Sequence, residues 1–154
     1  MKESSVFARQ LAIDCWSQEK IQAQRALLLG IGGLGTWVAQ SLCRLGIGKV
    51  ILLDYDNVEI SNLNRQILYS RSDLGKVKAE QAALHLKELH CVDEQTKVEW
   101  RSYCALKNWS KVVDLAKEST VVFNMIDYGD HFDAAVQSLC LKLNLPLFLG
   151  GTFN

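Results

Sequence analysis

The chain has 154 residues, the size of a single domain that can bury a hydrophobic core without disulfides or metals. Hydrophobic residues make up 49% of the sequence and only one proline occurs, which excludes a disordered or fibrous protein. Lysine and arginine together number 17, as do aspartate and glutamate, so the zero formal charge provides no overall attraction to nucleic acid or to an anionic membrane.

The cysteines and the hydropathy pattern favour an intracellular protein. The five cysteines are scattered and none forms a C-x-x-C pair, which is typical of reduced thiols rather than of a zinc or redox site. Cys43 and Cys140 lie beside apolar residues in helical segments and are predicted core residues. No secretory signal occurs, and no apolar run reaches the roughly 18 residues of a membrane span. We therefore expect a cytoplasmic localisation, with the nucleus as the alternative.

Short apolar runs alternate with segments of helical periodicity, which predicts a parallel α/β sheet. The predicted elements, in chain order, are a strand at 26–29, a helix at 34–45, a strand at 49–54, a polar loop at 55–73, a helix at 76–90, a strand at 97–102, a helix at 109–117, a strand at 120–124, a helix at 130–143 and a strand at 147–149. Together they indicate a Rossmann-like, mostly parallel sheet with helices on both faces, over residues 25–154. Residues 1–24 are predicted to form an N-terminal helical arm. Because a glycine pair, which usually starts a loop, directly follows the last strand, we expect a fold truncated at its C-terminus.

A glycine-rich loop follows the first predicted strand and opens the first helix. Its glycines are Gly30, Gly32, Gly33 and Gly35, and Asp54 follows nineteen positions later, at the end of the second strand. Glycines allow close approach of a phosphate or sugar, the helix N-terminus supplies free N–H groups, and the carboxylate can accept hydrogen bonds from a ribose. The pattern predicts an adenine nucleotide without separating NAD from ATP. The alternative is a glycine turn that only packs helix against strand.

Charged residues beyond Asp54 shift the interpretation towards ATP. The run Ser61-Asn62-Leu63-Asn64-Arg65-Gln66 and then Lys78 follow the second strand, at the sheet edge where ligands bind. A triphosphate needs such cations on its phosphates, whereas an NAD site does not. Asp127, after the fourth strand, is a candidate Mg²⁺ ligand. Taken singly, the alternatives are a solvated loop charge for Arg65, a surface lysine for Lys78 and a helix cap for Asp127.

These motifs resemble those of the ubiquitin-activating enzymes and of their bacterial relatives, the molybdopterin-synthase and thiamine-pathway adenylyltransferases. The resemblance runs from about Phe7 to Thr152. Its matching segments are F-A-R-Q at 7–10, G-I-G-G-L-G at 30–35, L-L-D-Y-D-N-V-E-I-S-N-L-N-R-Q at 52–66, D-L-G-K-V-K-A at 73–79, N-M-I-D at 124–127 and L-P-L-F-L-G-G at 145–151. The polar segments at 61–66 and 75–78 are the specific ones, since the glycine loop alone is common to many nucleotide-binding proteins.

The resemblance implies roles for individual residues. It implies that Gly33 lies against the nucleotide, that Asp54 binds the ribose, that Arg65 and Lys78 hold phosphates and that Asp127 binds Mg²⁺. It also implies that the arginine of the F-A-R-Q segment acts in trans across a homodimer or a heterodimer. The remaining residues of the implied nucleotide pocket are Gly30, Gly32, Gly35, Asp56, Ser61, Asn62, Leu63, Asn64, Gln66 and Tyr128, and the trans arginine is Arg9.

The implied reaction is ATP-dependent adenylation of the C-terminal glycine of a ubiquitin-like or sulfur-carrier protein, with ATP and Mg²⁺ as cofactors. Three alternatives remain: a non-catalytic or truncated partner subunit of a heterodimeric activating enzyme, a relative that modifies tRNA, and an NAD-binding Rossmann module. The neutral charge disfavours RNA. The presence of Arg65, Lys78 and Asp127 disfavours a non-catalytic partner, and Arg65 and Lys78 disfavour an NAD-binding module.

Overall fold

The structure, a computed structural model, describes residues 6–89 and 96–151. The helices are α1 (Gln18–Gln22), α2 (Gly33–Arg44), α3 (Lys78–Glu88), α4 (Trp109–Lys117) and α5 (Asp130–Leu143), and the strands are β1 (Arg25–Leu29), β2 (Lys49–Leu53), β3 (Lys97–Arg101), β4 (Val121–Asn124) and β5 (Leu147–Leu149). The start of the predicted arm, the predicted helix end at residue 90, Cys91 and the last residues of the family resemblance lie outside the described residues. No helix within the described residues is long and apolar enough to cross a membrane.

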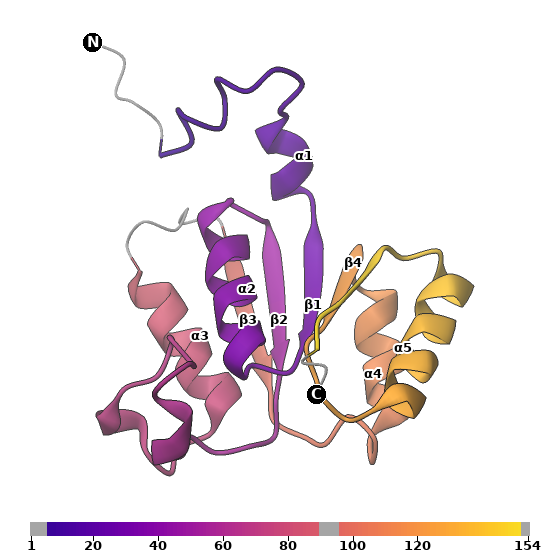
Figure 1. The fold of residues 1–154 in the computed structure, drawn as a ribbon. Coiled ribbons are helices and arrows are strands. Elements are labelled where there is room, and N and C mark those ends of the chain that lie inside the picture. The colour runs from indigo at the N-terminus through magenta and orange to yellow at the C-terminus, as the bar shows by residue number, and fades with distance from the viewer. Residues whose placement is uncertain (1–5, 90–95, 152–154) are drawn as a thin grey trace.

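The five strands form one parallel sheet in the order β3-β2-β1-β4-β5 (Figure 1). This order confirms the predicted Rossmann-like fold. The chain builds outwards from β1 to β3 and then returns to place β4 on the other side of β1. In open α/β sheets a ligand binds outside the carboxyl ends of the strands at such a reversal. The strand order therefore places a binding crevice where β1 and β4 end.

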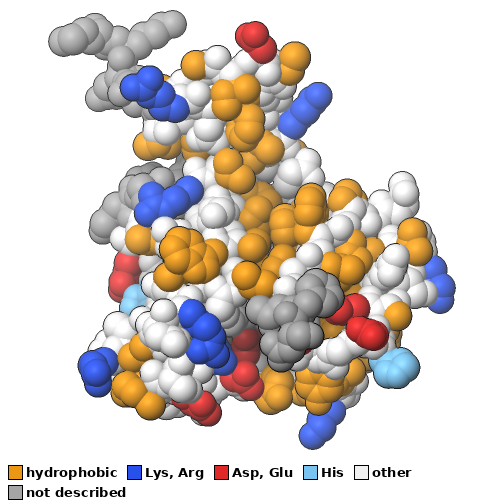
Figure 2. Space-filling view, viewed as in Figure 1, with side chains coloured by type: hydrophobic (Ala, Val, Ile, Leu, Met, Phe, Trp, Pro, Cys, Tyr) orange, Lys and Arg blue, Asp and Glu red, His pale blue; other side chains and the backbone are white. Residues whose placement is uncertain are grey.

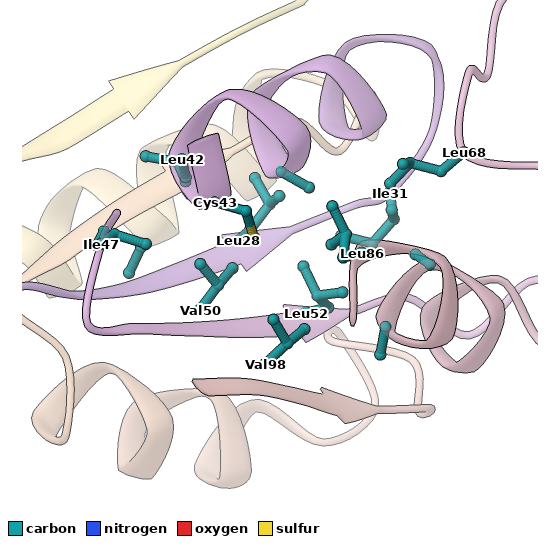
Figure 3. Packing of buried hydrophobic residues seen from close by; sticks show 14 of the residues in the cluster. Leu28, Ile31, Leu42, Cys43, Ile47, Val50, Leu52, Leu68, Leu86 and Val98 are labelled. Atoms are coloured by element: carbon teal, nitrogen blue, oxygen red, sulfur yellow. The ribbon is translucent and has the colours of Figure 1, made fainter. Parts of the chain in front are cut away.

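Hydrophobic clusters cover both faces of the sheet because successive strand residues point to opposite sides. On one face, Leu28 and Leu52 pack against Cys43 of α2 and Leu86 of α3 (Figure 3). On the other face, alternate residues of the same strands pack against α4 and α5, including Cys140. Both cysteines are buried, which confirms their predicted place in the core.

The segment predicted as a polar loop is more ordered than expected. It contains two short 3-10 helices, Ile60–Asn62 and Arg71–Asp73, each closed by a capping box. The helix predicted to begin at residue 76 begins at Lys78, because residues 75–78 first pair with residues 56–58. In this pairing Asn57 and Val77 form an antiparallel bridge, and the Lys78 N–H donates to the Asp56 carbonyl at 2.9 Å. The pairing returns the chain to the carboxyl end of β2.

An apolar face remains open on the side of the sheet that carries α2 and α3, since these helices pack over β1, β2 and β3. We define this apolar face by Leu34, Trp37, Phe123 and Phe148. The rings of Phe123 and Phe148 stack with centroids 4.9 Å apart, and Trp37 and Phe148 are 57% and 55% exposed. Figure 2 shows hydrophobic side chains gathered over this part of the molecule. A patch of this kind is typical of an interaction surface.

Gly35→Ala should lower the free energy of unfolding by roughly 1–3 kcal/mol, as overpacking does in a rigid setting. A Cβ at this position would lie 2.0 Å from the Gly30 carbonyl oxygen, so α2 would have to move away from the end of β1. Urea unfolding followed by circular dichroism measures the change.

Gly33→Ala is the matched control on the same helix. A Cβ at Gly33 would lie 3.5 Å from the nearest side-chain carbons of Arg65, an ordinary van der Waals contact. This variant should stay within about 0.5 kcal/mol of the parent. Equal losses in the two variants would show that close packing of Gly35 on Gly30 is not the cause.

Candidate functional site

A cavity of about 680 Å³ lies at the carboxyl edge of the sheet, at the reversal of strand order. Its volume is within the range of small-molecule sites, which is roughly 300–1,000 Å³. Several sequence-predicted residues line it together although they are far apart in the chain. These are Gly30, Gly32, Gly33, Asp54, Asp56, Arg65, Gln66, Lys78, Asp127 and Tyr128.

The glycine loop forms the floor of the cavity and leads into α2. Gly30 has a φ of +84°, and a Cβ there would lie 2.9 Å from the Met125 carbonyl oxygen, so only glycine fits. The Gly30 N–H donates to the Leu53 carbonyl at 2.8 Å, which ties the loop to the end of β2. Gly32 caps α2 without a side-chain hydrogen bond. The helix therefore offers backbone N–H groups and its positive dipole end to an anion in the cavity.

Asp54, which directly follows β2, is a buried residue that is 8% exposed, and its carboxylate contacts the glycine loop. Its Oδ2 accepts the Ile31 N–H at 2.7 Å and its Oδ1 accepts the Asp56 N–H at 2.9 Å. Burial raises the pKa of Asp54 above its ordinary value, although both backbone hydrogen bonds and the nearby Lys78 ammonium act to lower it. A carboxylate has about four acceptor positions, so capacity remains for ligand hydroxyls.

Lys78 brings a buried positive charge to the cavity. The residue is 6% exposed, and its Nζ lies 3.2 Å from Asp56 Oδ2. The Asp56 side chain is itself half exposed at the cavity wall. A buried ammonium is stable only beside a carboxylate or another anion. Asp56 therefore provides the charge partner of Lys78 while one side of the pair faces the cavity.

Arg65 and Gln66 form the wall above the glycine loop. The aliphatic part of Arg65 lies over Gly33, and its guanidinium donates to the Ser61 carbonyl at 2.9 Å and to Asn64 Oδ1 at 3.0 Å. Gln66 is 4% exposed, and its Oε1 has no hydrogen-bond partner within the described residues. Buried amides are normally paired, so this oxygen is an exception among the buried polar groups of the site.

The segment before Arg65 builds the wall rather than lining the cavity. Asn62 is buried, and its Oδ1 accepts the Glu59 N–H at 3.0 Å within the capping box. Leu63 packs against the hydrophobic core, and Asn64 holds the Arg65 guanidinium. Ser61 is exposed and its carbonyl accepts from Arg65. Direct contact of residues 61–64 with a nucleotide stays a prediction.

Asp127 and Tyr128 follow β4 on the far side of the cavity. Asn124 at the end of β4 positions them, because its amide donates to Asp133 Oδ1 of α5 at 2.7 Å and its Oδ1 accepts the Ile126 N–H at 3.3 Å. In residues 6–89 and 96–151 no three His, Cys, Asp or Glu side chains converge on a metal site. A Mg²⁺ ion here would therefore need ligand oxygens from a bound phosphate besides Asp127, as is usual for this ion.

One protein family matches the whole region that contains the glycine loop, the wall formed by Arg65 and Gln66, and Asp127. The sequence profile of the ThiF family matches residues 7–154. The chain belongs to the ThiF family. This confirms the resemblance predicted from the motifs.

Two curated proteins and one structure solved with ATP are similar to this ThiF-family chain. It is 34% identical over 155 residues to Adenylyltransferase and sulfurtransferase MOCS3 of Drosophila ananassae, covering 96% of this chain and 32% of that protein. It is 32% identical over 142 residues to Ubiquitin-like modifier-activating enzyme 5 of Aedes aegypti, covering 86% and 35%. The crystal structure of E. coli MccB + ATP has a TM-score of 0.77 at 29% identity, covering 89% of this chain and 39% of that one. The chain spans about a third of the length of these curated relatives.

Arg9 is the one predicted catalytic residue outside the cavity of this ThiF-family chain. Its segment docks at the opposite end of α2, where Phe7 is buried against Gly46 and the Gln10 amide donates to the Leu45 carbonyl at 3.4 Å. The twelve residues of α2 span about 18 Å. Arg9 is thus about a helix length from its own glycine loop.

Residues outside the sequence-predicted set also shape the site. Trp37, Cys104 and Leu106 line the cavity. The Tyr69 hydroxyl donates to the Ile31 carbonyl at 2.9 Å, and burial raises the pKa of Tyr69, so the hydroxyl stays protonated and holds the glycine loop. No motif marked these residues, because their positions depend on which loops meet in space.

Asp73 anchors the segment that delivers Lys78. Its side chain is 2% exposed, and Oδ2 accepts the N–H and hydroxyl of Ser70, each at 2.8 Å, and His85 Nε2 at 3.0 Å. Burial raises the pKa of Asp73, but the hydrogen bonds from Ser70 and His85 outweigh burial and leave the pKa below its ordinary value. The carboxylate therefore links the second 3-10 helix to α3.

Asp73→Asn should lower the free energy of unfolding at pH 7 by roughly 1–3 kcal/mol, since buried donors lose a charged acceptor. Because the folded-state pKa is lowered, this stabilisation is present above the unfolded value of about 3.8 and is lost as the pH falls through the folded-state value. Urea unfolding of parent and variant between pH 7 and pH 3 should show the difference shrinking below about pH 3.8.

Asp114→Asn is the control for this pH series. Asp114 forms a surface pair with Lys117, with side chains 70% and 58% exposed, so its loss should change stability by less than about 1 kcal/mol. A difference for Asp73→Asn that persists undiminished at pH 3 would exclude the ionised carboxylate as its source.

Proposed function

We propose that the chain binds ATP and contributes the nucleotide site for adenylation of the C-terminal glycine of a ubiquitin-like or sulfur-carrier protein. The observation that carries this proposal is one cavity lined jointly by a glycine loop at a helix N-terminus, a buried carboxylate and two cations, Arg65 and Lys78. An NAD site needs the first two features but not the cations. The names of MOCS3, of the modifier-activating enzyme and of the ATP complex of MccB support the same class of reaction.

The cavity suggests how ATP is held. The N-terminus of α2 faces the phosphates, and Asp54 uses its remaining acceptor capacity for the ribose hydroxyls. Arg65 contacts the phosphate oxygens through its planar fork, and Lys78 adds a point charge. A phosphate near Lys78 would share the ammonium with Asp56, which lies 3.2 Å from it. Asp127 would hold Mg²⁺ beside the phosphates.

The proposed step is attack of the carrier's terminal carboxylate on the α-phosphorus of ATP. The new bond joins the carboxylate oxygen to phosphorus, and the bond to pyrophosphate breaks, so the products are an acyl-adenylate and pyrophosphate. The nucleophile is already ionised at neutral pH, and no protein base is required. Arg65 and Lys78 would align the phosphates and stabilise the charge that develops on the leaving group.

A second family member completes the site in this proposal. Arg9 lies at the far end of α2 from its own cavity, so it reaches a nucleotide only across an interface between two chains. The exposed apolar face, which includes Trp37 and Phe148, offers area for such contact, whether in a homodimer or in a heterodimer. Arg9 would then act on the neighbour's phosphates as an arginine finger does.

Calorimetry should show binding of ATP with Mg²⁺ and weaker or no binding of NAD. Lys78→Ala should weaken ATP binding about tenfold or more, because a charge-assisted contact to phosphate is lost. Lys107→Ala is the control, since Lys107 is exposed beside the cavity but does not line it. Binding of NAD without ATP, or equal effects of the two substitutions, would contradict the proposed ligand.

Mixing Arg9→Ala with Lys78→Ala should restore part of the ATP–pyrophosphate exchange that each variant lacks alone, assayed with a carrier protein ending in glycine. A mixed dimer holds one site with both residues intact, so a one-to-one mixture should recover about a quarter of the parent rate. The control is a mixture of Arg65→Ala with Lys78→Ala. Both of these residues belong to the same chain's cavity, so every site stays defective. Failure of the first mixture, with mixed dimers shown by native mass spectrometry, would exclude action of Arg9 in trans.

A further inference from the structure

The ion pair between Asp56 and Lys78 joins a buried cation to a half-exposed carboxylate. Lys78 Nζ lies 3.2 Å from Asp56 Oδ2, and the two side chains are 8% and 50% exposed, with Lys78 the buried one. Both residues line the cavity at the carboxyl edge of the sheet. An ammonium that is removed from water loses its proton more easily, unless an anion within about 4–6 Å favours the charged form. The charge on Lys78 therefore depends on an anion beside it.

The backbone holds this pair together independently of the side-chain charges. The Lys78 N–H donates to the Asp56 carbonyl at 2.9 Å, and the Asp56 N–H donates to Asp54 Oδ1 at 2.9 Å. Asn57 and Val77 form an antiparallel bridge between the same two segments. A substitution of the Asp56 side chain therefore leaves the contacts that place the Lys78 backbone in the wall of the cavity.

Three other charged residues share the cavity with Lys78. Burial raises the pKa of Asp54, and the Lys78 ammonium is one of the groups that act against this rise, so Asp54 is within electrostatic range. The Asp54 carboxylate already accepts two backbone N–H groups. Arg65 has the same charge as Lys78 and disfavours a second cation, whereas Asp127 is an acid that follows β4. Asp56, by contrast, contacts the ammonium directly.

We propose that Asp56 is a positioning residue that keeps Lys78 charged before a nucleotide binds, so that ATP binds without uptake of a proton. The inference rests on the proposed function for its ligand. The phosphate oxygens of ATP then replace Asp56 as the anion beside the ammonium. Because Asp56 is half exposed, water can solvate its carboxylate after this exchange. Without the carboxylate, Lys78 would be a neutral amine in the free chain, and it would have to gain a proton from solvent when ATP binds.

Titration of Lys78 in the nucleotide-free chain tests the role of Asp56. The chemical shift of the Lys78 Cε carbon, followed by NMR, reports loss of the proton. Asp56→Asn removes the charge and keeps the shape, and it should lower the titration midpoint by about one pH unit or more. Asp56→Glu retains a carboxylate and should titrate as the parent does. Asp114→Asn is the matched control, because it removes the acid that is paired with the exposed Lys117 and should leave the Lys78 midpoint unchanged.

Calorimetry of ATP with Mg²⁺ between pH 7 and pH 9 tests the consequence for binding. Above the midpoint of its Lys78, the Asp56→Asn variant should lose affinity by up to about tenfold per pH unit, while the parent keeps its affinity to a higher pH. Binding to the variant should also take up a proton. That uptake appears as a heat of binding that changes with the ionisation enthalpy of the buffer.

Equal Lys78 midpoints in the parent and in Asp56→Asn would overturn the proposal. Equal decreases in the Asn and Glu variants would also overturn it, since shape rather than charge would then be the cause. A parent chain that binds no ATP contradicts the proposed function instead, and the titration without nucleotide still decides the role of Asp56. Asp56→Ser serves in the same titration if Asp56→Asn does not fold.

Discussion

The buried carboxylate of Asp54 is the constraint on which the site depends. It joins the glycine loop to the end of β2 by accepting the Ile31 N–H, and it starts the polar segment in a defined direction by accepting the Asp56 N–H. Burial of this charge is unfavourable, as its raised pKa indicates, and the two hydrogen bonds and the Lys78 ammonium offset only part of that cost. The carboxylate is therefore both a structural tie and a group with acceptor capacity for a ligand. An asparagine would preserve its shape but present an N–H to one of the two donors.

The parallel sheet divides the molecule into two chemically different edges. At the carboxyl edge, the loops that follow the strands line a cavity that contains both cations and carboxylates. At the amino edge, the cations Arg25, Lys49 and Lys97 stand in a row and the N-terminal segment docks on the end of α2. This separation follows from the single direction of all strands, since every strand start lies at one edge and every strand end at the other. It also explains why Arg9, at the amino edge, lies far from the cavity of its own chain at the carboxyl edge.

Local patterns in the sequence determined the elements and the main chemistry of the candidate site. Helix α5 spans Asp130–Leu143, as its apolar spacing predicted, and β5 spans Leu147–Leu149. Glycine spacing located the loop before α2, because close packing of helix on strand leaves no room for a Cβ at Gly35. The sequence identified the charged residues Asp54, Arg65, Lys78 and Asp127 because each follows a predicted strand or opens a predicted helix. Such positions can be read from the sequence alone. Their part in binding a nucleotide stays a prediction.

Only the tertiary structure decided which of these residues face the cavity and what holds them there. The pairing of residues 56–58 with 75–78 delays the start of α3 and brings the Lys78 ammonium to Asp56, twenty-two positions away. Asn62 and Leu63 turn inwards as structural residues, whereas Trp37 and Leu106 line the cavity without any motif. The row of Arg25, Lys49 and Lys97 exists only because three strands start in register. These features depend on hydrogen bonds and packing between segments that are distant in sequence. The secondary-structure propensity of a short segment contains no information about such contacts.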